Sequence, residues 1–429
     1  MSSDLYSRDF DAPVANRAIS ATVELPGSKS LTNRELVLSA LAKEPTKLTG
    51  ALVSRDSALM ISALEALGAK IEGAGTTTPT VYPATLATDS SIDCGLAGTV
   101  MRFVPPISVL NKGVTSFDGD LAARRRPMNT TIESLRALGA HVENQDGGLP
   151  FTVHGSGEVD GGEITIDASS SSQFVSGLLL AAARFKNGLT LRHKGEHLPS
   201  LPHIEMTLQC LRERGVAVSE PESSVWRVEP GEIAGGTKNI EPDLSNAGPF
   251  LAAALVASGS VTIPHWPSVT TQVGDEFDGI LQQMGATVVR DERGLTVTGS
   301  GEILGVDIDL SIGGELAPVI AGLAVLATSE SRLRGIAHLR GHETDRLAAL
   351  ATEINRIGGD CTETEDGLII KPSSNLRGAL WHTYEDHRMA TTGAIIGLRV
   401  PGITIENIGT TAKTMPNFVE LWTNMLGDA

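Results

Sequence analysis

The sequence predicts an α/β protein of two domains, each made of three repeated units with buried helices. Three observations predict this fold. A helix that ends in glycine and runs into a strand recurs at intervals of about 70 residues. A second series of strongly apolar helices recurs in phase with the first. Six units of this length exceed the size of a common single domain, so the 429 residues divide more naturally into two.

Glycines mark the first series. Each follows a helical segment such as LEALG or LRALG, and a stretch containing Val or Ile comes next. Glycine supplies the left-handed conformation that ends a helix, and the following stretch predicts a strand. The markers are Gly68, Gly139, Gly215, Gly285 and Gly358, at spacings of 71, 76, 70 and 73, and Gly427 comes 69 residues later. The sixth unit then lacks its strand, and we expect residues 19–27 (ISATVELPG) to fill the gap, with both termini in one domain.

The second series consists of helices that open with small or polar residues and continue as apolar stretches. Their markers are Arg34, Arg102, Gln173, Asn246, Glu315 and Arg388. These helices are apolar on nearly every face, so we expect them in the centres of the domains. Their N-termini carry free N–H groups and partial positive charge, which suits them to bind anions.

We place the domain boundary between the third and fourth units. The first domain then comprises residues 25–240, and the second comprises residues 1–24 together with 241–429. A noncatalytic repeat scaffold that binds anions is the alternative. The long period and the reactive residues at the helix starts argue against a scaffold.

Composition excludes several classes of function. A hydrophobic share of 41% and a mean hydropathy of +0.03 describe an ordinary globular protein. The longest apolar run, residues 317–327, is too short for a membrane span. The net charge of −17 disfavours nucleic acid and anionic membranes as partners. We expect a cytoplasmic, monomeric protein that acts on small anionic molecules.

The cysteines indicate neither a disulfide nor a zinc site. Cys94, Cys210 and Cys361 are odd in number, lie far apart and form no CxxC pair. We therefore expect no metal and no cofactor.

Short basic motifs stand where an anion could bind. LPGSKSLTNR carries Lys29, Ser30 and Arg34, and GDLAARRRPM carries Arg124, Arg125 and Arg126, two of which we expect to be solvated. Four serines precede the helix of Gln173. Further motifs supply Glu343, Arg346, His387, Arg388 and Lys413. Each alone is more simply explained as structural, but together, at equivalent phases of a repeat, they favour recognition of carboxylate and phosphate.

Seven motifs taken together resemble the 5-enolpyruvylshikimate-3-phosphate synthase family of enolpyruvyl transferases. In chain order, from about residue 25 to residue 416, they are LPGSKSLTNR, GLAGTVMR, RRRPM, SSSSQF, GHETDRL, YEDHRM and TAKTMP. The resemblance implies an inverse α/β barrel-like fold, with three βαβαββ units in each domain and a cleft between the domains. It implies transfer of the enolpyruvyl group of phosphoenolpyruvate to the 5-hydroxyl of shikimate 3-phosphate. The reaction passes through a tetrahedral intermediate, releases phosphate and uses no metal or cofactor.

The same resemblance assigns roles to residues of this sequence. It implies that Glu315, Lys29 and Glu343 are catalytic. For shikimate 3-phosphate it implies Lys29, Ser30, Arg34, Ser171, Ser172, Gln173, Ser200, Glu315 and His342. For phosphoenolpyruvate it implies Lys29, Gly98, Arg126, Gln173, Arg346, Arg388 and Lys413.

Several positions depart from the commoner family pattern. Leu96, Phe103 and His203 stand where Asn, Pro and Tyr are expected. Glu315 replaces the commoner Asp and His342 the commoner Lys, and both keep acid–base or donor capacity. Leu96 and Phe103 bear on sensitivity to glyphosate, the family's inhibitor, more than on the reaction.

The rival within this fold is the enolpyruvyl transferase that acts on UDP-N-acetylglucosamine. That family carries a cysteine in a loop at about the place of residues 119–127, where this sequence has three arginines and no cysteine.

Overall fold

The computed structural model describes residues 9–195 and 198–427. Residues 196–197 of the predicted first domain, and 1–8 and 428–429 of the predicted second, lie outside the described residues. The chain divides into two compact units: residues 27–241, here the 27–241 unit, and residues 1–26 with 242–429, here the terminal unit. Six small sheets alternate with helices over the described residues, so the predicted α/β class is confirmed.

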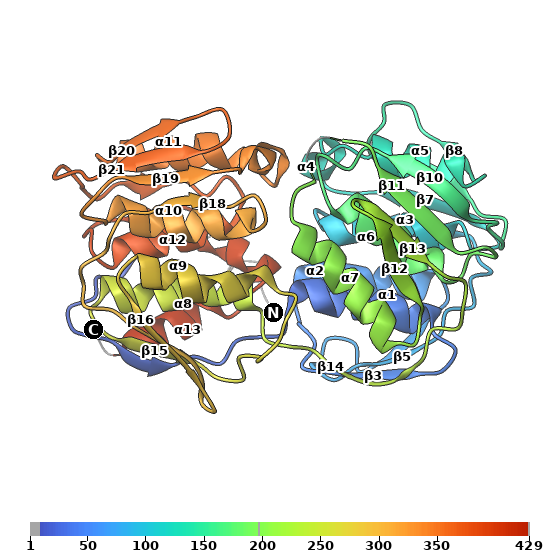
Figure 1. The fold of residues 1–429 in the computed structure, drawn as a ribbon, viewed down its shortest axis with the longest axis horizontal. Helices are drawn as coiled ribbons and strands as arrows, with labels where there is room; N and C mark the ends of the chain where they lie inside the picture. Colours follow the sequence, from blue (N-terminus) through green and yellow to red (C-terminus); the bar gives the residue numbers. More distant parts are fainter. Residues whose placement is uncertain (1–8, 196–197, 428–429) are drawn as a thin grey trace. The chain divides into compact units, whose positions relative to one another are not determined.

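The three sheets of the 27–241 unit, some of whose strands are labelled in Figure 1, share one strand order. In each, a first strand pairs in parallel with a second, and two further strands follow antiparallel. In spatial order the sheets are β14 (Gly236–Asn239), β3 (Thr46–Thr49), β5 (Thr80–Tyr82) and β4 (Lys70–Glu72); β6 (Ser90–Asp93), β7 (Val114–Asp118), β9 (Phe151–His154) and β8 (His141–Glu143); β10 (Gly162–Ile166), β11 (Leu189–His193), β13 (Val225–Val228) and β12 (Val218–Glu222).

The helices of this unit form an inner and an outer set. The inner helices, which pack against one another, are α1 (Lys29–Leu41), α3 (Gly98–Ser108) and α6 (Gln173–Ala182). The outer helices are α2 (Arg55–Ala66), α5 (Asn129–Ala137) and α7 (Leu201–Glu213), and the short α4 (Leu121–Arg124) precedes α5. All of α3, and α6 beyond its first residue, are buried, which confirms that the apolar series lies in the core.

The terminal unit repeats the plan. Its sheets are β2 (Ser20–Thr22), β15 (Ser260–Ile263), β17 (Gly294–Thr298) and β16 (Thr287–Asp291); β18 (Asp307–Asp309), β19 (Ser331–Arg334), β21 (Leu368–Lys371) and β20 (Asp360–Glu363); β22 (Leu380–Trp381), β23 (Thr404–Ile405) and β1 (Phe10–Asp11). Its inner helices are α8 (Leu244–Val256), α10 (Ala317–Val325) and α12 (His387–Gly397). Its outer helices are α9 (Phe277–Gln283), α11 (Arg346–Arg356) and α13 (Phe418–Leu426), with 3-10 turns at η2 (Val273–Glu276), η3 (Gly314–Leu316), η4 (Ala337–Gly341) and η5 (Ile408–Lys413).

The N-terminal segment does supply strands to the terminal unit, but the predicted pairing of ISATVELPG with the sixth unit was wrong. The segment ISATVELPG supplies β2, which pairs in parallel with β15 in the fourth unit. The sixth unit is completed instead by β1, which pairs antiparallel with β23. A two-residue strand has no alternating pattern to reveal it, so counting repeats could not separate these outcomes. The 27–241 unit closes in the same way, because β14 near its end pairs with β3 near its start.

The glycine markers end their helices as predicted. Their φ angles are +95° at Gly68, +90° at Gly139, +79° at Gly215, +100° at Gly285, +86° at Gly358 and +68° at Gly427. These values lie in the left-handed region, where glycine carries no steric penalty.

An arginine follows the third inner helix of each unit and binds carbonyls at helix ends. Arg184 donates to the carbonyl of Leu41 at the end of α1, at 2.8 Å. Arg399 donates to Val256 at the end of α8 (2.9 Å), to Gly301 (2.7 Å) and to Leu326 after α10 (3.4 Å). Burial lowers the pKa of Arg399. Its charge complements the partial negative ends of the helices. No described helix is both long and apolar enough to cross a membrane.

Candidate active site

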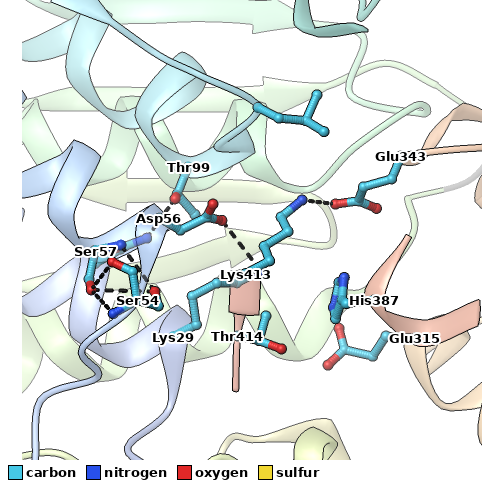
Figure 2. Close-up of polar contacts among 12 residues, drawn as sticks. Lys29, Ser54, Asp56, Ser57, Thr99, Glu315, Glu343, His387, Lys413 and Thr414 are labelled. Atoms are coloured by element: carbon cyan, nitrogen blue, oxygen red, sulfur yellow. Dashed lines mark hydrogen bonds and ion pairs between the residues drawn. The ribbon is translucent and has the colours of Figure 1, made fainter. Parts of the chain in front are cut away.

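Lys29 begins α1, directly after the strand-to-helix turn that the sequence singles out. The Ser28 hydroxyl caps the helix by accepting from the Leu31 amide at 3.4 Å. The Lys29 ammonium lies 3.9 Å from a carboxylate oxygen of Asp56, which is buried in the first turn of α2 (Figure 2). The Lys29 side chain keeps 21% of its surface exposed, so its charge stays accessible to an anion.

Arg34 lies inside the protein rather than at its surface. Only 1% of the residue is exposed. Its guanidinium donates to the Thr207 hydroxyl (2.8 Å), the Ser176 hydroxyl (3.2 Å), the His203 carbonyl (2.8 Å) and the Ser30 carbonyl (3.0 Å). These bonds tie α1 to α6 and to the first two turns of α7. The structure therefore places the Arg34 guanidinium in the interior of the 27–241 unit.

Gly98, Gln173 and Arg126 come together, as their predicted shared ligand requires. Gly98 begins α3 and Gln173 begins α6. A Cβ on Gly98 would lie 2.9 Å from Oε1 of Gln173 and 3.2 Å from both terminal nitrogens of Arg126. Oε1 of Gln173 and Nε of Arg126 are buried and have no hydrogen-bond partner among the described residues. Such buried polar atoms are rare in native proteins, and here they lie beside the start of an inner helix.

The three arginines of RRRPM (residues 124–128, here the arginine loop) differ in exposure, and two are solvated as the sequence predicts. Arg124 makes two hydrogen bonds to Asp118, at 2.9 and 2.6 Å, and its side chain is 44% exposed. Arg125 is also exposed. Arg126 instead turns inward and donates to the Leu96 carbonyl at 3.3 Å.

The serines of SSSSQF and Ser200 directly precede two helices of the 27–241 unit, α6 and α7. Ser172 is 4% exposed, and the Ser171 hydroxyl accepts from the Gln173 amide at 3.2 Å. Ser200 precedes α7 with φ +55° and ψ +48°. A residue with a side chain is uncommon in this left-handed region, and such positions cluster at functional sites.

Glu315 lies in η3, at the start of the α10 region of the terminal unit. Its Oε1 accepts a hydrogen bond from the Ser245 hydroxyl and lies 3.7 Å from a terminal nitrogen of Arg388. Arg388 also donates to the Ser245 carbonyl at 3.4 Å. The side chains of Glu315 and Arg388 are 19% and 12% exposed, so a carboxylate and a guanidinium face each other in a largely buried setting.

Arg346 is the centre of a second cluster in the terminal unit. It donates to Asp386 at 2.7 and 3.2 Å and to Glu343 at 3.0 Å, and it lies 3.1 Å from Nδ1 of His342. Burial alone would lower the pKa of Arg346, but the carboxylates of Asp386 and Glu343 outweigh burial, and the pKa rises. Lys413 donates to the other oxygen of Glu343 (Figure 2). Glu343 thus joins two cations and can carry a proton to or from the lysine.

Several residues of these clusters were not predicted from the sequence. Asp386 is fully buried, caps α12 by accepting from the Arg388 amide at 2.8 Å, and binds Arg346. An Asp directly before a helix is a capping signal, and that signal was available in YEDHRM. Ser245 opens the apolar segment of α8 and was detectable only as one more small polar residue.

His338, also not predicted, lies beside Gly314 and Glu315. A Cβ on Gly314 would meet its Nε2 at 2.5 Å, and Nε2 has no hydrogen-bond partner among the described residues. Burial lowers the pKa of His338 to about 4, the charge of Arg346 acts in the same direction, and Glu315 opposes it. The imidazole is therefore neutral at physiological pH.

Comparisons with known proteins identify the family. Residues 14–422 match the family model of EPSP synthase (3-phosphoshikimate 1-carboxyvinyltransferase). A 3-phosphoshikimate 1-carboxyvinyltransferase of Kocuria rhizophila is 56% identical over 426 residues, covering 95% of this chain and 94% of the relative. Two solved structures of EPSP synthase from Acinetobacter baumannii are each 26% identical, cover 96% of this chain and 97% of theirs, and superpose with TM-scores of 0.81 and 0.80. The chain therefore belongs to the EPSP synthase family.

Proposed function

We propose that this protein transfers the enolpyruvyl group of phosphoenolpyruvate to the 5-hydroxyl of shikimate 3-phosphate, in the shikimate pathway of aromatic amino-acid biosynthesis. Membership of the EPSP synthase family over residues 14–422 carries the proposal. The local geometry supports it, because both units gather cations at the starts of buried helices, where anions bind favourably.

Phosphoenolpyruvate presents a phosphate and a carboxylate, and arginines suit both groups. We assign its binding to Lys29, Gly98, Arg126, Gln173, Arg346, Arg388 and Lys413. Nε of Arg126 and Oε1 of Gln173 have no hydrogen-bond partner among the described residues, which suits them to a polar ligand. Arg346 is held in a fixed orientation by Asp386, so little side-chain entropy is lost when it binds a ligand.

Shikimate 3-phosphate is assigned to Lys29, Ser30, Arg34, Ser171, Ser172, Gln173, Ser200, Glu315 and His342. Serine hydroxyls can donate to the phosphate and hydroxyl oxygens of such a ligand. The accessible charge of Lys29 matches a ligand that carries phosphate.

Glu315 is the proposed proton acceptor. In the addition step, the 5-hydroxyl oxygen bonds to C2 of phosphoenolpyruvate, its proton passes to Glu315, and a proton is delivered to C3. The product of this step is a tetrahedral intermediate. In the elimination step, the C–O bond to phosphate breaks while a proton leaves C3, which gives the enolpyruvyl ether and phosphate. The proton at C3 is exchanged either by Glu343 together with Lys413 or by Lys29. Glu343 accepts a hydrogen bond from Lys413, and Lys29 lies 3.9 Å from Asp56, so in each case a proton donor stands beside an oppositely charged group.

The proposal extends to the domain bounds, the cellular location and the oligomeric state of the protein. The proposed domains are residues 25–240 and residues 1–24 with 241–429. We assign the protein to the cytoplasm as a monomer that requires neither metal nor cofactor and binds neither nucleic acid nor membranes.

The test is a phosphate-release assay with phosphoenolpyruvate and, in separate reactions, shikimate 3-phosphate or UDP-N-acetylglucosamine as acceptor. We expect phosphate release with shikimate 3-phosphate alone. Release with the nucleotide sugar would assign the chain to the rival reaction. Ligand binding without phosphate release from either acceptor would indicate a noncatalytic anion-binding protein.

A further inference from the structure

A cluster of two histidines and a glutamate occupies the exposed face of the β8–β9 hairpin. His141 on β8 and His154 on β9 are direct partners in the antiparallel ladder. Their rings stack with centroids 4.6 Å apart and planes at 28°. Glu143, two residues beyond His141 and therefore on the same face, lies 2.9 Å from Nε2 of His154. None of the three has a role in the transfer reaction proposed above.

We propose that His141, Glu143 and His154 bind a divalent transition-metal ion, with Zn²⁺ as the physiological candidate. Each residue offers one ligand atom, and all three atoms lie within 4.8 Å of one another. A tetrahedral zinc centre with bonds of 2.0–2.2 Å needs ligand atoms about 3.3–3.6 Å apart. Among the described residues this is the one group of at least three His, Cys, Asp or Glu side chains gathered this closely.

Small side-chain rotations are enough to complete the geometry. His141 and Glu143 are exposed and His154 is half-buried, so their outer torsions can adjust without moving the strands. The hydrogen bond from His154 already brings the carboxylate and one imidazole within ligand spacing. The neighbouring ladder partners on this face, Val114 and Thr152, carry no charge that would repel a cation.

The donor set selects the metal. Two neutral imidazoles and a carboxylate favour Zn²⁺, Cu²⁺ or Ni²⁺, whereas Mg²⁺ and Ca²⁺ prefer oxygen ligands. Three protein ligands leave at least one position for water. The site therefore binds reversibly, with affinities in the order Mn²⁺ < Co²⁺ < Ni²⁺ < Cu²⁺ > Zn²⁺.

The bound ion would join the edge of a sheet to its interior. β8 is the last strand in the order β6-β7-β9-β8, and the proposed ligands come from β8 and the adjacent β9. The loop between these strands also meets the arginine loop, since the Met128 amide donates to the Gly147 carbonyl at 3.1 Å. The metal stabilises the hairpin because it binds the folded state alone.

Calorimetric titration of the chelator-treated full-length protein with Zn²⁺ tests the proposal, and Co²⁺ absorption spectra report the coordination geometry. We expect one equivalent of Zn²⁺ to bind, unaffected by millimolar Mg²⁺. His141→Ala and His154→Ala should each weaken that binding at least tenfold, and Glu143→Gln should weaken it less. The control is His382→Ala, which removes a histidine 3.1 Å from a single carboxylate, that of Glu406, and should leave zinc binding unchanged.

Two results would overturn the proposal. One is the absence of a stoichiometric zinc-binding event in the wild-type protein. The other is binding that survives in the His141→Ala/His154→Ala double variant, which would place the metal elsewhere. The inference does not depend on the proposed transferase function, because its readout is metal binding and requires no substrate.

Discussion

Gly98 and Gln173 approach so closely that a methyl group on Gly98 would lie 2.9 Å from Oε1 of Gln173. The same methyl group would meet the guanidinium of Arg126 at 3.2 Å. Gly98 is not among the residues with positive φ, so space rather than backbone conformation requires glycine here. Any larger residue must push aside the two side chains assigned to phosphoenolpyruvate.

Gly98→Ala should therefore raise KM for phosphoenolpyruvate about tenfold or more, with a smaller effect on KM for shikimate 3-phosphate. Steady-state kinetics with each substrate varied in turn measure both constants. Gly279→Ala is the matched control, because this helical glycine has nothing within 4 Å of an added Cβ. Equal KM values for wild type and Gly98→Ala would show that this corner does not contact the substrate.

Arg126 and Arg124 differ in environment although they lie two residues apart. A hydrogen bond from a charged donor to a ligand contributes about 1.5–3 kcal/mol, whereas an exposed ion pair contributes about 0–1 kcal/mol. Arg126→Ala should raise KM for phosphoenolpyruvate at least tenfold, and Arg124→Ala should change it less than threefold. Similar effects from both substitutions would contradict the inward assignment of Arg126.

Glu315→Gln tests the proton acceptor. Glutamine keeps the size of the side chain and can still bond to Ser245, but it cannot accept the hydroxyl proton. Loss of a general base costs about 10²–10⁴ in rate. We expect kcat to fall by that factor while shikimate 3-phosphate binds within a few-fold of wild type by calorimetry. Near-normal turnover would remove Glu315 from the proton transfers and point to Glu343 or Lys29.

His338 should make the protein less stable in mild acid. Its folded pKa of about 4 lies below the ordinary histidine value of 6.5, so between these values the unfolded chain binds a proton that the folded chain does not. The destabilisation is absent above pH 6.5, grows as the pH falls, and reaches at most about 3 kcal/mol near pH 4.

The substitution His338→Asn places an uncharged side chain here and should remove this pH-dependent loss of stability. Urea unfolding at pH 7.5, about 5.5 and about 4.5 should show the variant gaining stability relative to wild type as the pH falls. A difference between variant and wild type that stays constant with pH would mean that His338 titrates normally in the folded protein.

Arg399→Met should destabilise the terminal unit. The substitution keeps much of the aliphatic volume but leaves the carbonyls of Val256, Gly301 and Leu326 without their charged donor. A buried acceptor left unsatisfied costs about 1–3 kcal/mol. The bonds to Val256 and Leu326 are part-buried and the bond to Gly301 is exposed, so water replaces part of what is lost and we expect a loss of about 2–3 kcal/mol. Arg293→Met, which removes an exposed ion pair with Asp291, should cost less than about 1 kcal/mol in the same urea experiment.

Periodic features were readable from the sequence. The spacing of Gly68, Gly139 and Gly215 revealed the repeat, and each of these glycines has the left-handed conformation that a helix end favours. The apolar segments of α3 and α6 revealed the buried helices, since a helix with no polar face has no alternative to the core. The solvation of two of the three arginines at 124–126 also followed from a general rule about charge runs, whereas the choice of Arg126 came from the family resemblance. These features depend on residues close together in the chain.

Contacts between distant segments were decided only by the tertiary structure. The pairing of β1 with β23 joins residues near opposite ends of the chain, and nothing in their composition specifies it. The sequence singles out Arg34 as a cation near the start of an apolar helix, but its contacts with Thr207 and His203, far along the chain, depend on the tertiary structure. The approach of His141 and His154 depends on the register of two strands. Sequence patterns record what a residue prefers locally, whereas a site depends on which segments the packed core brings together, and that is a property of the whole chain.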